Sequence, residues 1–219
     1  MSIDQFRMIV KGIAMAETPE IASQPEIIDV QQALRRNYVR MTKDLLLRAG
    51  IVAALVIAGG AVETWGPEDS PLMGIFIVPA TFVLIFTVFR FAFGTRLVKC
   101  RTVLRHYPLE FHAHIAKNSV DWTKYGDVFT FRVASDNPSS PPLLRGAKAI
   151  GGRRWPKGTE GGVWVAGDMD FGGVILVPGS EEMLFFQPAD WDGTTPVRER
   201  AEGDRVEKAA RARLLRKAV

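Results

Sequence analysis

The sequence is poor in cysteine, with Cys100 as its single thiol in 219 residues. One cysteine excludes an internal disulfide, which agrees with soluble parts that lie in a reducing cytoplasm. The first 30 residues also lack the continuous apolar core of a signal peptide. We therefore expect the N-terminus to be retained rather than cleaved.

Charge is nearly missing from two apolar segments, 45–62 and 72–89, in which Arg48 is the single charged side chain. At 1.5 Å per residue, each segment is long enough to cross a hydrocarbon layer of roughly 30 Å. Backbone in lipid must satisfy its own hydrogen bonds, so the sequence predicts two helices folded back as a hairpin. The missing mid-span ionisable groups disfavour a transporter or proton relay and favour an anchor.

Lysine and arginine are missing from the connecting stretch 63–71, which carries Glu63, Glu68 and Asp69. The outer flanks of the two segments are basic, with Arg35, Arg36, Arg40 and Lys43 before the first and Arg48 in its first turn, and Arg90, Arg96, Lys99, Arg101 and Arg105 after the second. The positive-inside rule then predicts a multi-pass plasma-membrane protein with both termini in the cytoplasm. Its cytoplasmic parts would carry 28 basic and 21 acidic residues, a net +7 facing an anionic leaflet.

Small residues recur every four positions in the first segment, at Gly50, Ala54 and Ala58. Such a stripe lets another helix approach closely, so we expect either the second segment or a second copy of the chain to pack there. Pro79 interrupts the second segment and predicts a kink.

A cytoplasmic stalk helix is predicted from about Pro25 into the first segment, because Ser23 and Glu26 have the spacing of a capping box. Its apolar stripe requires a cover, either the chain's own C-terminal domain, a second copy or a different protein. We take the stripe and the small-residue face as interaction residues: Ile27, Leu34, Tyr38, Met41, Gly50, Ala54 and Ala58.

The region after the hairpin has short apolar runs divided by Gly/Pro turns, which is typical of a small antiparallel barrel or sandwich. Strands are predicted at 109–116, 128–134, 162–166, 174–177 and 183–187. The fold class is thus α+β. The expected parts are an amphipathic segment and linker (1–24), the stalk and hairpin with spans at about 45–63 and 72–91 (25–93), a cytoplasmic β-rich domain (94–192) and a charged helix or tail (193–219).

Metal and catalytic patterns are incomplete. Cys100, His106, His112 and His114 lie within fifteen residues, and a strand would put the last two on one face, yet zinc-site spacing is missing. Asp168 and Asp170 open a stretch that partly matches kinase and calcium motifs but lacks their other elements. We interpret the histidines as surface or packing residues and the aspartates as part of a tight loop, and predict no catalytic residue, cofactor or metal.

A basic run without acids contains Arg145, Lys148, Arg153, Arg154 and Lys157, with Trp155 among them. It is either a solvated loop or a contact to lipid headgroups beneath the bilayer. Specific nucleic-acid binding is not expected, because one tryptophan makes no stacking platform. The candidate headgroup residues are Arg96, Lys99, Arg101, Arg153 and Arg154.

The motifs Trp-Pro-Lys-Gly (155–158), Gly-Val-Trp-Val-Ala-Gly-Asp-Met-Asp-Phe-Gly-Gly-Val (162–174), Val-Pro-Gly (177–179) and Phe-Gln-Pro (186–188) carry a resemblance. Together with the hairpin, they resemble uncharacterised actinobacterial two-span membrane proteins. The resemblance implies an actinobacterial cell membrane and no known activity.

We therefore expect a non-enzymatic, membrane-anchored adaptor that recruits a protein assembly at the cytoplasmic face. The alternatives are an accessory subunit of a transporter or secretion complex, and a metal-dependent enzyme. Expected partners are the bilayer and proteins that bind the stalk or the small-residue face, with a homo-oligomer as an open alternative.

Overall fold

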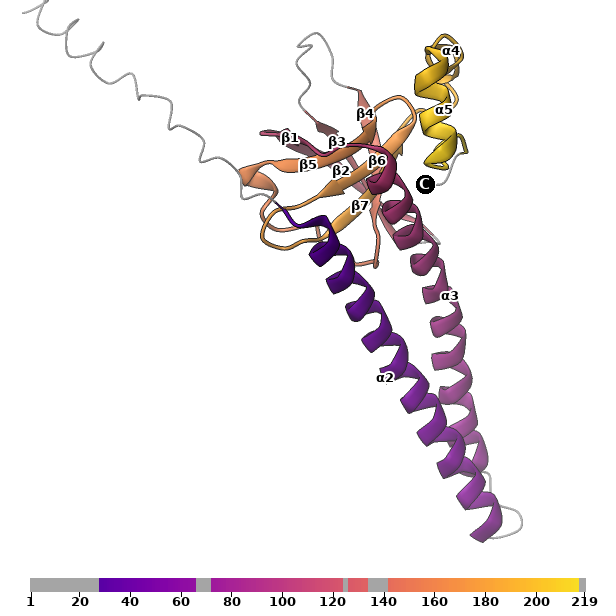
Figure 1. Cartoon of the computed structure of the whole chain (residues 1–219). Helices are drawn as coiled ribbons and strands as arrows, with labels where there is room; N and C mark the ends of the chain where they lie inside the picture. Colours follow the sequence, from indigo (N-terminus) through magenta and orange to yellow (C-terminus); the bar gives the residue numbers. More distant parts are fainter. Residues whose placement is uncertain (1–27, 66–71, 124–125, 134–141, 217–219) are drawn as a thin grey trace, which may run out of the picture.

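The computed structural model describes residues 28–65, 72–123, 126–133 and 142–216, which form two long helices, a β-sheet and short C-terminal helices (Figure 1). The helices are α2 (Val30–Trp65), α3 (Leu72–His106), α4 (Thr195–Glu199) and α5 (Gly203–Arg211), with a 3-10 turn η1 (Thr159–Gly161). The strands are β1 (Glu110–His112), β2 (Ile115–Thr123), β3 (Gly126–Val133), β4 (Leu143–Lys148), β5 (Val163–Asp168), β6 (Gly172–Leu176) and β7 (Met183–Pro188). The chain is α+β, as predicted.

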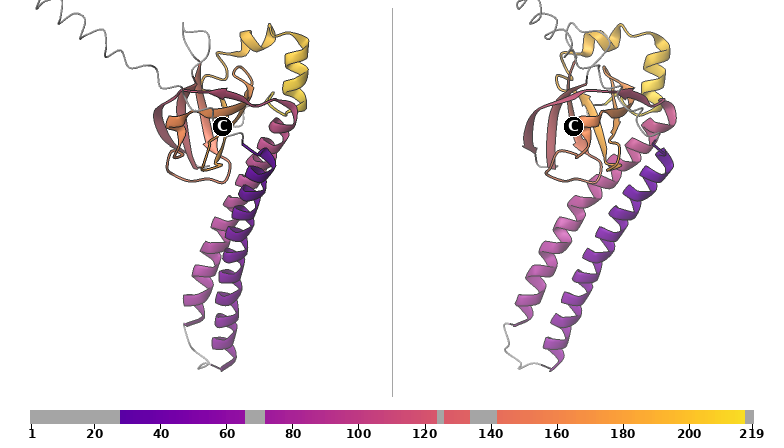
Figure 2. Two further views of the ribbon diagram at one scale, coloured as in Figure 1. Left: turned by 60° about the vertical axis from the view of Figure 1, so that its left-hand side comes forward. Right: turned by 90° about the vertical axis from the view of Figure 1, so that its left-hand side faces the viewer.

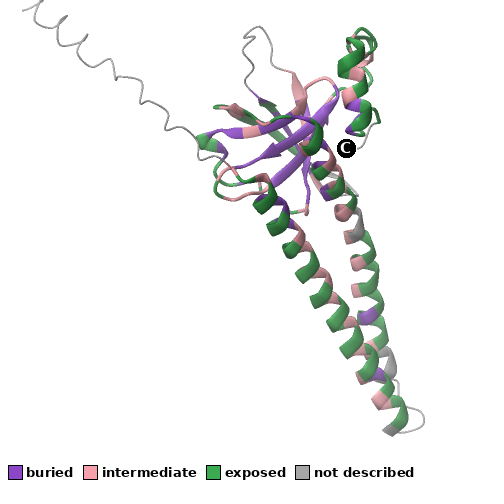
Figure 3. Cartoon of the chain, in the orientation of Figure 1, coloured by how far each residue is buried: buried purple, intermediate pink, exposed green. Residues whose placement is uncertain are grey.

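Both long helices are apolar and long enough to cross a membrane, over Val30–Thr64 and Ile75–His106. With 36 residues, α2 is about 54 Å long, which is more than the thickness of roughly 30 Å of a hydrocarbon layer. Large apolar side chains along the pair stay exposed: Leu46, Ile57 and Phe82 are 66, 71 and 58 % accessible. Figure 3 shows this exposed surface along most of both helices, whereas the central part of the sheet is buried.

Helix α2 begins later than the sequence predicts. Ile28 and Asp29 precede it, and the Asp29 side chain accepts hydrogen bonds from the backbone N–H groups of Gln31 (2.8 Å) and Gln32 (3.2 Å). Asp29 is therefore the N-cap, and a helix start at Pro25 is wrong because a second capping residue lies nearer to the apolar stripe. The predicted amphipathic segment, the linker and Ile27 lie outside the described residues.

The contact between α2 and α3 uses other small residues than predicted. A Cβ on Gly59 would lie 3.4 Å from the Phe76 Cβ, and one on Gly94 would lie 3.6 Å from the Met41 sulfur. By contrast, Gly50 and Ala54 are exposed, and nothing lies within 4 Å of a Cβ built on Gly50. The second segment does pack on the first, but along the Gly59 side.

A polar contact also joins the two helices near the end of the apolar segments. Asp44 Oδ2 lies 3.1 Å from Arg48 Nε of its own helix and 3.1 Å from Arg90 Nη1 of α3. Since Asp44 and Arg90 flank the two segments on the same side, this ion pair marks one common boundary of the hairpin.

The sheet is a seven-stranded antiparallel half-barrel in the order β1-β5-β6-β7-β4-β3-β2. It is one sheet and not a sandwich, since each strand from β5 to β3 in this order pairs on both sides. The predicted strand 109–116 is wrong: it splits into β1 and the start of β2, which form opposite edges. The other predicted strands are confirmed to within a few residues, whereas β4 and most of β2 were not predicted.

Two apolar clusters cover the two faces of the central strands. Along β6 and β7 the side chains alternate, with Val174 and Phe185 in one cluster and Ile175 and Phe186 in the other. Strands buried on both faces have continuous apolar sequences, which explains why β6 and β7 were recognised as apolar runs in the sequence. The first cluster also contains helix residues and the C-terminal Leu214, so the half-barrel packs on one end of the helix pair (Figure 2).

Candidate functional site

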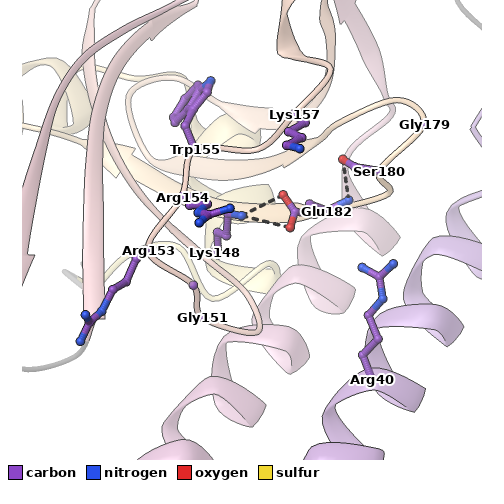
Figure 4. Close-up of a pocket in the computed structure, with 11 residues that line it drawn as sticks. Arg40, Lys148, Gly151, Arg153, Arg154, Trp155, Lys157, Gly179, Ser180 and Glu182 are labelled. Carbon is purple, nitrogen blue, oxygen red and sulfur yellow. Dashed lines mark hydrogen bonds and ion pairs between the residues drawn. The ribbon is translucent and has the colours of Figure 1, made fainter.

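Cationic side chains gather around a pocket of about 570 Å³ between α2 and the half-barrel (Figure 4). Three segments form it: α2, the end of β4 with the loop after it, and the turn between β6 and β7. The lining residues are Arg40, Lys148, Gly151, Gly152, Arg153, Arg154, Trp155, Lys157, Gly179, Ser180 and Glu182. Five cations and one carboxylate thus line the pocket.

Lys148 forms the buried floor of this pocket. It is 8 % exposed, and its Nζ donates to Glu182 Oε1 (3.0 Å) and Oε2 (2.9 Å). A buried ammonium requires such a partner, since an unpaired charge is strongly destabilised away from water. Glu182 is therefore engaged by Lys148, and the other four cations have no carboxylate within ion-pair distance among the residues that the structure describes.

The loop that carries Arg153 and Arg154 is held at both ends. At Gly151, where φ is +80°, a Cβ would lie 2.9 Å from the Phe93 ring of α3, so the backbone rests directly on that ring. At the other end, the Trp155 ring packs against Phe129 with 5.3 Å between centroids, and its Nε1–H donates to the Thr159 hydroxyl at 2.8 Å. The loop is thus a fixed support for exposed arginines.

Arg40 approaches the same pocket from α2. Its side chain extends from the helix toward the turn that contains Ser180 and Glu182 (Figure 4). In the sequence, Arg40 is recognisable only as a flanking charge, because no local pattern connects it with residues more than a hundred positions later. Its role in the pocket follows from tertiary packing alone.

The five predicted headgroup residues are not brought together. Arg153 and Arg154 line the pocket, whereas Arg96, Lys99 and Arg101 lie along α3 and do not. The Arg96 guanidinium lies 5.3 Å from the Phe93 ring centroid, and Lys99 Nζ lies 5.6 Å from that of Phe185. Arg101 is exposed. Two of these α3 cations thus also contact aromatic rings.

The predicted interaction stripe of the stalk is covered by the chain itself. Leu34 is 6 % exposed within the cluster shared with the half-barrel, and Tyr38 and Met41 are half-buried against it. Among the three alternatives for the cover, the C-terminal domain is the one that lies there. Along the small-residue face, Gly50 and Ala54 are exposed and Ala58 is half-buried.

The histidines and the cysteine are dispersed. His106 ends α3, His112 belongs to β1, and His114 lies in the turn before β2. The prediction that His112 and His114 share one face of a strand is therefore wrong. Cys100 belongs to α3 and is buried in the cluster that the helices share with the half-barrel. Across the described parts of the chain, no group of three or more His, Cys, Asp or Glu side chains is placed to hold a metal ion.

The two aspartates of the predicted tight loop bind an arginine. This loop joins β5 to β6, and the Phe171 N–H donates to the Asp168 carbonyl at 3.1 Å. Arg205 of α5 donates from Nε and Nη2 to Asp168, both at 2.9 Å, and from Nη2 to Asp170 at 2.8 Å. A bidentate arginine occupies the carboxylates that a cation would need. The pairing was not predicted, because the tail sequence shows only mixed charge.

Tyr107 lies beside this ion-pair group. It is 8 % exposed, and its hydroxyl has no hydrogen-bond partner among the described residues. Burial, with a smaller contribution from the negative charge of Asp168, raises the pKa of Tyr107 to about 12. The positive charge of Arg205 acts in the opposite direction and lowers this pKa in part.

No family model, curated protein or solved structure matches the chain. The resemblance to two-span actinobacterial proteins is thereby supported only in its architecture, two long apolar helices and a C-terminal antiparallel β half-barrel.

Proposed function

We propose that the chain is a membrane-anchored adaptor, which holds its half-barrel against the cytoplasmic face of the plasma membrane and docks a protein assembly there. The observation that carries this proposal is the cluster shared by the helices and the sheet. Leu34 and Leu97 of the helices and Phe185 of the sheet are all buried in it. A domain packed in this way has a fixed orientation relative to its membrane anchor, which suits presentation of a surface.

The cytoplasmic orientation is supported by the charge on the two sides of the hairpin. The stretch 63–71 is acidic, whereas the helix ends that approach the half-barrel are basic. The Asp44–Arg90 ion pair lies at this basic end, where charged groups reach the headgroup layer.

The edge strand β2 is the docking surface that we favour. It is nine residues long and pairs with β3 on one side only among the described strands. Its residues from Ala116 to Asp121 are exposed, and Val120 is 41 % accessible. An unpaired edge offers backbone N–H and C=O groups to an extended peptide of a partner, which would add a strand to the sheet.

The test compares two exposed valines in the full chain, purified with its partners from native membranes in mild detergent. Val120→Glu places a charge on the β2 edge, and Val197→Glu places the same charge on α4, where Val197 is 48 % accessible. We expect the first variant to lose the co-purifying proteins and the second to retain them. The same proteins with both variants would refute docking at this edge.

A second candidate, an accessory subunit of a membrane complex, is favoured by the exposed small residues Gly50 and Ala54, which face away from α3. They would allow a helix of another protein to pack closely. Gly50→Leu with Ala54→Leu should then abolish co-purification, whereas an adaptor that docks through β2 should keep its partners.

A further inference from the structure

We propose that the cationic pocket binds the phosphate group of an anionic lipid headgroup. This inference rests on the membrane anchoring proposed above and adds a ligand to it. The pocket would recognise a phosphate with at least one negative charge. We take a lipid as the source of this phosphate because the pocket is expected at the level of the headgroup layer.

Charge is the first argument. Arg40, Arg153, Arg154 and Lys157 surround the pocket without an ion-pair partner among the described residues, and the single lining carboxylate already accepts two hydrogen bonds from Lys148. Like charges that line one pocket repel one another, and a bound anion would relieve this repulsion. Arginine suits phosphate because its planar fork donates two parallel hydrogen bonds.

Rigidity is the second argument. The arginine loop is fixed by Gly151 on Phe93 and by Trp155 on the sheet, and Arg40 belongs to a long helix. Little conformational entropy of the backbone would therefore be lost when the site is occupied. Ser180, whose hydroxyl oxygen lies 3.4 Å from the Glu182 N–H, adds a hydroxyl donor to the lining.

The position of the pocket relative to the bilayer also favours a lipid, and it is estimated independently from α2 and from α3. Arg40 precedes the apolar segment that starts at Leu45 by five residues, about 7.5 Å along the helix axis. Phe93, which supports Gly151, follows the segment that ends at Phe89 by four residues, about 6 Å. The headgroup layer extends roughly 5–8 Å beyond the hydrocarbon on each side. The α2 backbone at Arg40 and the α3 residue that supports Gly151 are therefore both expected within the headgroup layer.

The experiment titrates the full chain, in a detergent of zwitterionic headgroup, with short-chain phosphatidic acid. Inorganic phosphate and short-chain phosphatidylcholine are titrated in parallel, and binding is followed by calorimetry. We expect saturable binding of phosphatidic acid and much weaker binding of the other two. Equal affinity for inorganic phosphate would overturn the assignment to lipid, and no saturable binding of phosphatidic acid would overturn the site.

Matched variants separate the pocket from general surface charge. Arg153→Gln with Arg154→Gln removes two lining cations, and Arg132→Gln with Arg200→Gln removes two exposed arginines that do not line the pocket. We expect roughly tenfold weaker binding or more for the first pair and a change within about twofold for the second, since cations act on an anionic headgroup only at close range. Equal losses would overturn the site.

Arg40→Gln tests whether the two walls act together. If α2 and the arginine loop form one site, this variant should bind phosphatidic acid more weakly than wild type. Unchanged binding would overturn a site shared by α2 and the loop. Membrane insertion is measured separately by extraction at alkaline pH. An inserted protein that binds no phosphatidic acid refutes only this inference, whereas a protein that stays soluble without detergent refutes the anchoring itself.

Discussion

Asn37 of α2 donates a hydrogen bond from Nδ2 to the carbonyl oxygen of Glu181, 2.9 Å away in the turn between β6 and β7. The same nitrogen donates to the Ala33 carbonyl at 2.7 Å, and the Asn37 side chain is buried at 2 % exposure. Beside it, Arg36 Nη1 lies 2.9 Å from Glu181 Oε1. A specific polar contact thus adds to the apolar cluster and fixes α2 against the half-barrel.

Asn37→Ala should destabilise the folded chain by about 1–3 kcal/mol, because it leaves the partly buried Glu181 carbonyl without its donor. Urea unfolding of the detergent-solubilised protein measures this change. Gln32→Ala, at an exposed position of the same helix, is the control and should have little effect. Equal stability of the two variants would show that the contact does not hold the domains together.

Tyr107→Phe should leave stability at pH 8 unchanged or slightly higher, because the buried hydroxyl has no partner among the described residues. Above pH 10 the variant should become the more stable of the two. The pKa of Tyr107 is raised to about 12 in the fold, so an unfolded chain releases this proton first, and wild-type stability falls as pH rises through 10 to 12.

Unfolding of both proteins in urea at pH 8, 10 and 11.5 measures this difference. The loss for wild type should approach about 1.4 kcal/mol per pH unit between the two pKa values. Parallel pH profiles for wild type and Tyr107→Phe would contradict the burial of a protonated phenol.

Gly151→Ala should displace the arginine loop from α3, because the new methyl group meets the Phe93 ring at 2.9 Å in a residue with φ of +80°. Gly179→Ala is a matched control, since Gly179 has φ of +70° and nothing within 4 Å of its Cβ. Both variants carry the backbone strain of about 1 kcal/mol, so the difference between their unfolding free energies reports the contact with Phe93. Identical values would mean that the loop does not rest on Phe93.

Arg205→Lys should loosen α5 from the half-barrel, because lysine cannot donate in parallel to Asp168 and Asp170. The side chain of Arg205 is 43 % exposed, so we expect a modest loss of about 1 kcal/mol that shrinks further at high salt. Limited proteolysis of the C-terminal region is the readout. Arg211→Lys, which alters a surface pair with Glu207 within α5, should leave the proteolysis rate unchanged.

Hydropathy alone predicted both long helices, because each contains an apolar stretch long enough to cross a membrane. The apolar runs of β5, β6 and β7 were equally clear, since these strands are buried on both faces. The start of α2 was misplaced because two capping residues, Ser23 and Asp29, precede the same helix. Local patterns do not rank such alternatives.

Strands β2 and β4 were missed for different reasons. Residues 116–121 of β2 are exposed at a sheet edge and largely polar, so the apolar alternation that marks a strand is weak. In β4, Arg145 and Lys148 made the segment resemble part of a basic loop. Only the pairing of Lys148 with Glu182, 34 residues later, explains why a lysine is buried there.

The most direct test of the account is a topology measurement in intact cells, with single cysteines in a Cys100→Ser background. A membrane-impermeant maleimide is applied to two proteins, one with Ser70→Cys in the acidic stretch between the helices and one with Ala210→Cys on exposed α5. We predict labelling of the first in intact cells and of the second only after the cells are opened. Labelling of Ala210→Cys from outside, or recovery of the protein in the soluble fraction, would contradict a hairpin that anchors the half-barrel at the cytoplasmic face.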